Sequence, residues 1–199
     1  MGFGTVRRVV YALACLCLAG AVAAAEPGKA TFENPLVAVR DVYGAAGQPA
    51  GITTGRDAVI IDLEKAQAQF VPRYSAGTIP SAKAVVVELK TDGPGKPLAN
   101  TSNYPDAFPR PNINQILDSA RVRVWDYTWT PGVPPPTHFH TMPALPVFLA
   151  DGALRSESPS GEISVTPHYV GHWRYQLEGR LHTEHLDKGA ARAIIVEFK

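Results

Sequence analysis

All six histidines of the chain lie between His138 and His185, and the first 137 residues contain none. His138 and His140 are separated by a single residue, so on a β-strand both side chains point to one face and Phe139 to the other. Two imidazoles on one face can bind a single cation at about 2.0–2.1 Å. The same spacing also occurs in exposed or hydrogen-bonded pairs that bind no metal, so the surrounding sequence has to decide between these interpretations.

The segments that would position these histidines are short and apolar or β-branched. They cover residues 36–42, 58–63, 84–89, 122–129, 147–149 and 193–198. Turn clusters such as TDGPGKP (91–97) separate them, and the chain holds 18 prolines and 17 glycines. Many short strands joined by such turns predict an all-β sandwich or barrel. A short helix at 64–69 or at 113–117 stays open as an alternative.

Residues 121–129, RVRVWDYTW, alternate between two faces, with Arg121 and Arg123 on the aromatic face and Asp126 and Thr128 on the other. The aromatic residues share one face and the valines share the other: Trp125, Tyr127 and Trp129 against Val122 and Val124. A strand that is apolar on both faces is expected between two layers, and its aromatic residues either line a cavity or form ordinary core. The segment 100–114 contains three prolines and is predicted to be a loop, which either stays at the surface or folds over the mouth of a barrel.

Residues 132–140 read GVPPPTHFH and resemble the first motif of the cupin superfamily, in which a glycine is followed after five residues by H-x-H. In that motif a glutamate comes three or four residues after the second histidine, and a glycine comes six residues after the glutamate. Gly152 occupies the glycine position when the spacing is four, and Leu145 then stands at the glutamate position. With the shorter spacing Ala144 stands there instead. The motif is therefore matched except for its carboxylate.

The second cupin motif, G-x5-P-x-G-x2-H-x3-N, can be aligned in two registers. In one register the histidine is His172, preceded by Gly161 and Pro167 and followed by Gln176 at the asparagine position. In the other it is His182, with Gly171 and Gly179 matching and with Leu177 and Leu186 at the proline and asparagine positions. The second register leaves eighteen residues between the motifs, enough for two strands and a turn. We therefore predict His182 as the third histidine of the site.

The resemblance implies an all-β cupin fold, a double-stranded β-helix barrel with extra N-terminal strands, preceded by a signal peptide. We expect the signal peptide at 1–25, an N-terminal strand extension and connecting loop at 26–120, and the barrel core at 121–199. Cupins often pair through their outer strands, so the resemblance also implies a homodimer.

The resemblance places His138, His140 and His182 on inward faces near one end of the barrel, as ligands of one metal ion. Without the glutamate, three neutral imidazoles would hold the ion. Imidazoles suit transition metals better than Mg or Ca, which prefer oxygen ligands. Some cupin dioxygenases lack the glutamate and hold ferrous iron with three histidines, so Fe(II) is favoured, ahead of Zn, Ni, Cu or Mn.

Glu184 is the candidate catalytic residue. It lies two residues beyond His182, so a regular strand places both side chains on one face. Its carboxylate is then a fourth ligand, a partner that orients His182, or a general base for the substrate. The alternative is a solvated acid at the rim of the barrel. His168, His172 and His185 are expected to be structural or exposed, with His168 in a turn and His172 near the start of a strand.

The N-terminus has the pattern of a secretory signal peptide. Arg7 and Arg8 are followed by an apolar run over 9–24, which ends in Ala23-Ala24-Ala25. The run is shorter than the about 20 residues that a membrane-spanning helix needs. We therefore expect a secreted or periplasmic protein that has no membrane attachment after cleavage.

The composition of residues 26–199 narrows the classes of partner. Both cysteines precede the predicted cleavage site, which excludes disulfides and thiolate ligands from this part of the chain. It holds 17 basic residues, the chain's 19 less Arg7 and Arg8, against 18 acidic residues. No basic patch stands out, so we expect a small-molecule substrate or ligand and no nucleic acid.

These observations together favour an exported, metal-dependent oxidoreductase of dioxygenase type that acts on a small organic substrate through its three histidines. One alternative is a non-catalytic periplasmic cupin that binds a metal or a small ligand. Another is a sugar isomerase or epimerase in which a histidine acts as the base without metal.

Overall fold

The computed structural model describes residues 30–43, 50–79, 81–93 and 95–199, so the predicted signal peptide at 1–25 lies outside the described residues. Within these ranges the chain forms strands, turns and loops and no helix, which confirms the all-β prediction. Among the same residues there is accordingly no helix long and apolar enough to cross a membrane.

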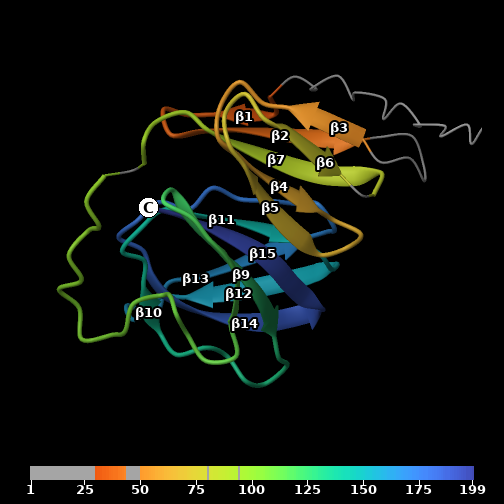
Figure 1. Ribbon diagram of the computed structural model, residues 1–199. Coiled ribbons are helices and arrows are strands. Elements are labelled where there is room, and N and C mark those ends of the chain that lie inside the picture. Colours follow the sequence, from red (N-terminus) through yellow and green to blue (C-terminus); the bar gives the residue numbers. More distant parts are fainter. Residues whose placement is uncertain (1–29, 44–49, 80, 94) are drawn as a thin grey trace, which may run out of the picture.

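The N-terminal part of the chain forms one five-stranded antiparallel sheet and a small ribbon. The sheet has the order β1 (Phe32–Glu33), β2 (Val37–Tyr43), β7 (Lys83–Leu89), β4 (Ala58–Asp62) and β5 (Gln67–Val71). The ribbon pairs β3 (Ala50–Thr53) with β6 (Ala76–Ile79). Figure 1 shows this sheet stacked on the C-terminal strands.

The C-terminal part forms two four-stranded antiparallel sheets. One has the order β11 (Ala144–Phe148), β15 (Ala191–Phe198), β9 (Val122–Trp129) and β8 (Asn114–Asp118). The other has the order β10 (His138–Phe139), β14 (Leu181–Gly189), β12 (Gly152–Glu157) and β13 (Ile163–His168). The two sheets face each other and form the barrel (Figure 1).

The short helices considered at 64–69 and 113–117 are wrong, because a turn and the start of β5 occupy the first segment and β8 occupies most of the second. The first segment begins with a turn instead. Asp62 Oδ1 accepts hydrogen bonds from the backbone N–H groups of Glu64 at 3.0 Å and Lys65 at 2.8 Å. An Asp that binds the backbone two and three residues ahead favours a turn over a helix here.

Strand β9 is buried on both faces, as its alternation predicted. Its valines join a core between the N-terminal sheet and the barrel, which contains Val37, Val39, Val59, Ile61, Val85, Val87, Val122, Val124, Leu145, Val147, Ile194 and Val196. Its aromatic residues face the barrel interior, where they pack with Phe148, Leu154 and Ile195. An ion pair between Asp57 and Arg121, at 2.6 Å, also joins the N-terminal sheet to the barrel.

The segment that connects the two parts folds over one end of the barrel. Ala107 donates its N–H to the Phe139 carbonyl at 2.8 Å, and Phe139 donates its own N–H to the Pro105 carbonyl at 2.9 Å. The segment thus runs beside β10, the strand that carries His138 (Figure 1). A few residues later the side chain of Arg110 is buried in the barrel.

Candidate metal centre

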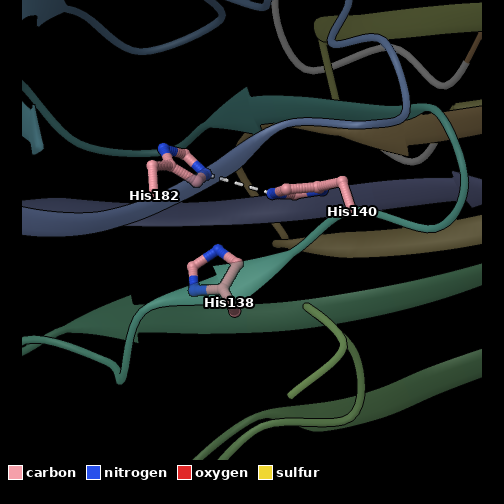
Figure 2. Close-up of side chains that lie close together, drawn as sticks. All are labelled: His138, His140 and His182. Carbon is pink, nitrogen blue, oxygen red and sulfur yellow. Dashed lines mark hydrogen bonds between the residues drawn. The ribbon is translucent and has the colours of Figure 1, made fainter. Parts of the chain in front are cut away.

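Three histidines from two neighbouring strands meet inside the barrel. β10 and β14 are antiparallel with His138 opposite His182, and His140 follows β10 directly. The Nε2 atoms of His140 and His182 are 3.1 Å apart, and all three imidazoles offer ligand atoms within 4.8 Å of one another. Figure 2 shows the three rings converging on one space.

Hydrogen bonds orient two of these rings. The Nδ1–H of His138 donates to the Pro136 carbonyl at 2.8 Å, which leaves its Nε2 unprotonated. The Nδ1 of His182 is 2.6 Å from the hydroxyl of Ser156 on β12, so its Nε2 faces the cluster. Nδ1 of His140 is buried without a hydrogen-bond partner in the described part of the chain. Hydrogen-bond partners like those of His138 and His182 fix the tautomer and the ring direction of metal-binding histidines.

Burial makes the three imidazoles neutral at neutral pH. It lowers the pKa of His182 to about 3, an effect that Glu184 opposes. It also lowers the pKa of His138, with the Arg110 charge adding to the effect, and it puts the pKa of His140 well below the ordinary value. Neutral imidazoles carry the free lone pairs that a metal requires.

The donor set fits a divalent transition metal. Two nitrogens that are each about 2.0–2.1 Å from one ion lie roughly 2.9–3.4 Å apart at octahedral or tetrahedral angles, and His140 and His182 are separated by 3.1 Å. Three buried imidazoles suit Fe, Zn, Ni or Cu. The cluster therefore has the composition and spacing of a three-histidine metal site.

Glu184 lies on the same face of β14 as His182, deep in the barrel rather than at its rim. Its Oε2 accepts a hydrogen bond from Trp129 Nε1 at 3.2 Å and pairs with Arg110 NH1 at 3.5 Å. Burial acts to raise the pKa of Glu184, but the neighbouring His182 and the positive charge of Arg110 outweigh this effect, so the net shift is downward. The carboxylate is ionised and engaged by Trp129 and Arg110, while Ser156 orients His182.

Arg110 is a site residue that the sequence did not indicate. Its NH1 is 3.4 Å from Nε2 of His138, and its guanidinium lies 3.9 Å from the centre of the Tyr127 ring. Burial lowers its pKa, against the opposing effects of Glu184 and Tyr127. Only the proline-rich loop that carries it stood out in the sequence, and a loop pattern does not reveal where a side chain points.

The two residues considered for the glutamate position of the first cupin motif, Ala144 and Leu145, face opposite sides of β11. On β11, Ala144 faces the barrel interior with Phe148. Leu145 points the other way, into the core shared with the N-terminal sheet. Of the two residues considered for this position, only Ala144 therefore faces the barrel interior. Either residue leaves this position without a carboxylate.

A small cavity lies next to the cluster. It is about 10 Å³, room for about one water molecule. Phe108, Trp129 and Phe148 supply much of its apolar wall, and its charged groups are Arg110, Arg174 and Glu184. A larger open groove of about 600 Å³ lies along residues 174–180 and shares Arg174 and Gln176 with the cavity. One of the β9 tryptophans thus lines the cavity.

The remaining histidines lie outside the cluster. His168 ends β13, where it stacks on Phe148 at 4.1 Å and donates to the Ala190 carbonyl, so its predicted place in a turn is wrong. His172 lies directly after the turn at 170–171 and one residue before Trp173, which bridges to Val147 of β11, and it stacks on Tyr169. His185 is 3.9 Å from Glu157. The structure thus brings His182, and not His172, to the pair on β10.

The two facing antiparallel sheets, with three histidines inside one end, form the double-stranded β-helix that the motifs implied. The chain has the cupin fold and carries a buried three-histidine cluster.

No protein-family model matches the sequence, and no curated protein matches it. Similar solved structures include a cupin domain from Bordetella pertussis Tohama I, 23% identical with a TM-score of 0.41, over 49% of this chain and 98% of that one. A cupin 2 conserved barrel domain protein from Leptotrichia buccalis is 10% identical with a TM-score of 0.41, over 84% and 86%. The polyketide cyclase RemF from Streptomyces resistomycificus is 15% identical with a TM-score of 0.37, over 49% and 70%. At these identities the likeness concerns the fold alone.

Proposed function

We propose that this protein is an exported, metal-dependent cupin oxidoreductase of dioxygenase type, which holds Fe(II) with three histidines and acts on a small organic molecule. The observation that carries the proposal is the convergence of three neutral, buried imidazoles beside a largely apolar cavity. A site of this kind keeps coordination positions open for reactants because the protein supplies only three ligands.

The chain's own residues have distinct tasks in this proposal. Pro136 and Ser156 hold the rings of His138 and His182 with their Nε2 atoms toward the centre. Glu184 balances the charge of Arg110, and the aromatic wall excludes water from the cluster. A bound ferrous ion would supply Lewis acidity and one-electron redox chemistry. Because Trp129 donates a hydrogen bond to Glu184 and Arg110 pairs with it, we propose that Glu184 positions Arg110 rather than acting as a general base.

Export and assembly are further parts of the proposal. The basic, apolar and small-residue pattern of residues 1–25 supports cleavage and release into the periplasm or the medium. Edge strand β13 leaves Ile163 and Val165 more than half exposed, which supports pairing of two copies through this sheet. Light scattering of the purified protein tests the homodimer.

The first experiment is elemental analysis of protein purified after expression of the full chain, so that any processing takes place. We expect close to one equivalent of transition metal, lost in His182→Ala and retained in His172→Ala. The iron-loaded protein is then tested for oxygen consumption with a broad panel of phenols, diketones and small organic carboxylates. Metal-free protein after reconstitution with Fe, Zn, Ni, Cu and Mn would rule out the site, and an inert iron protein would rule out the dioxygenase.

The volume of the cavity supports one second candidate, a non-catalytic metal- or ligand-binding cupin. A space of about 10 Å³ admits little beyond one water-sized group unless the loop that carries Arg110 moves. Ligand-induced thermal stabilisation without turnover would favour this candidate. A metal-free isomerase or epimerase would instead keep its activity after chelation.

A further inference from the structure

We propose that Arg174 forms a carboxylate-binding subsite between the open groove and the barrel cavity, and that the substrate is a small organic carboxylate. This inference rests on the proposed function, because it names the substrate class of the same site. It is carried by the position of Arg174, by the absence of an ion pair or side-chain hydrogen bond to its guanidinium in the described residues, and by the charge of the cavity.

Arg174 lies where the groove meets the cavity. Arg174 and Gln176 line both spaces, whereas His140 and Glu184 line only the inner one. The backbone of this segment is fixed on β11, since Arg174 N–H donates to the Pro146 carbonyl at 3.2 Å and Gln176 N–H donates to the Ala144 carbonyl at 2.8 Å. A molecule that approaches the histidines from the groove therefore passes a guanidinium held on a rigid support.

The guanidinium of Arg174 forms no ion pair or side-chain hydrogen bond within the described residues, although the charge of Glu184 opposes the effect by which burial lowers its pKa. Its Nε is buried without a hydrogen-bond partner, and no carboxylate there lies within 4.0 Å of it. Its guanidinium carbon lies 5.8 Å from the centre of the Phe148 ring. A buried N–H donor without an acceptor is costly, so Nε of Arg174 favours a ligand that accepts its hydrogen bond.

The charge of the cavity also favours an anion. Arg110 and Arg174 are its cations and Glu184 is its only carboxylate, so one positive charge remains when the histidines are neutral. A guanidinium binds a carboxylate through two parallel hydrogen bonds. Arg110 already pairs with Glu184 and Arg180 donates to Ser156, which leaves Arg174 to bind the ligand.

The volumes of the inner cavity and of the groove indicate where the rest of the substrate would lie. The inner cavity of about 10 Å³ takes only a small group, while the groove of about 600 Å³ takes larger ones. A carboxylate on Arg174 thus fixes a molecule at the boundary, with its smallest group toward the histidines and its bulk in the groove. Such anchoring would set both affinity and orientation.

Calorimetric binding to the metal-loaded full-chain product tests the subsite. The probes are acetate, propionate and benzoate, each beside its neutral amide. We expect at least one carboxylate to bind wild type and to bind Arg174→Gln at least tenfold more weakly, with Arg174→Lys in between. Arg73→Gln, which removes a charge from an exposed side chain of the N-terminal sheet, is the matched control and should bind as wild type does.

Stability and metal content separate a ligand role from a structural one. Arg174→Gln should keep its metal and unfold at the same or a higher temperature, because an unpaired, partly buried charge has been removed. A lower unfolding temperature with unchanged carboxylate binding would overturn the proposal, as would the absence of binding for every carboxylate or equal affinity for carboxylates and amides. Carboxylate binding that depends on Arg174 without oxygen consumption would preserve the subsite and reject the dioxygenase.

Discussion

Arg110 and Glu184 form an ion pair inside the barrel, and the same NH1 atom of Arg110 that is 3.5 Å from Glu184 is 3.4 Å from Nε2 of His138. Arg110 comes from the connecting loop and Glu184 from β14. The pair thus joins the loop, the histidine cluster and the barrel wall through one guanidinium. It also sets the charge beside the metal site, because each ion balances the other.

Glu184→Gln should destabilise the protein strongly without removing the metal. The substitution leaves Arg110 buried without its carboxylate, which costs about 3–5 kcal/mol in comparable buried pairs. Because Glu184 lies outside the group of ligand atoms, metal content should stay near that of wild type. Urea unfolding and elemental analysis measure the two effects. Arg110→Met should rescue much of the loss in the double variant, and loss of metal in Glu184→Gln would show that the carboxylate is a ligand.

Ser156→Ala should weaken metal binding by about 10–100-fold, the usual effect of removing a partner that orients a ligand. The hydroxyl of Ser156 is 2.6 Å from Nδ1 of His182 and holds that ring toward the other two. Competition with a coloured chelator gives the affinity. Ser164→Ala, at an exposed position of β13, provides the control. Equal affinity of both variants and wild type would mean that packing alone orients His182.

Leu145→Ala should lower the free energy of unfolding by about 2–5 kcal/mol, as large-to-small substitutions in a core do. Leu145 is fully buried between the N-terminal sheet and the barrel, on the face of β11 opposite the cluster. Metal affinity measured on the folded protein should therefore be unchanged. A drop in metal affinity together with unaltered stability would place Leu145 at the site after all.

Asp57→Asn should cost about 1–2 kcal/mol at neutral pH through the loss of a charged acceptor. Burial acts to raise the pKa of Asp57, but the Arg73 N–H and the Arg121 guanidinium lower it more, so its net pKa is below 3.8. The ionised form is thus favoured by folding, and its contribution is present above pH 3.8 and lost as the pH falls through the folded pKa. The difference between wild type and variant should shrink over that range in urea titrations. A difference that is constant with pH would assign the effect to packing.

The strands and the histidine cluster could be predicted because their signals are local or periodic. Alternation of residue types identified β9 and its two buried faces. Motif spacing identified His182 as the histidine that joins His138 and His140. The spacing between His140 and the glutamate position of the motif could be three or four residues. That difference of one residue decides between Ala144 and Leu145, which face opposite ways because they are neighbours on a strand. Sequence alternation shows which residues of a strand share a face. It does not show which residue occupies a motif position unless the spacing of the motif is known.

The partners of the cluster could not be predicted, because they come from tertiary contacts. Ser156 reaches His182 only through the pairing of β12 with β14. Arg110 enters the barrel because its loop runs along β10, and nothing in the loop sequence specifies that path. Trp129 could be placed on a face of β9, but its hydrogen bond to Glu184 depends on the opposite sheet.

Strand β10 has consequences for the order in which the protein folds. It is two residues long and is held between the connecting loop and β14, segments that are far from it and from each other in the sequence. Such non-local contacts form late, because long stretches of chain must first be brought together. The histidines therefore converge only when the barrel has closed. A metal ion would bind the finished fold and not the unfolded chain, so its full binding free energy would add to the stability of the native state.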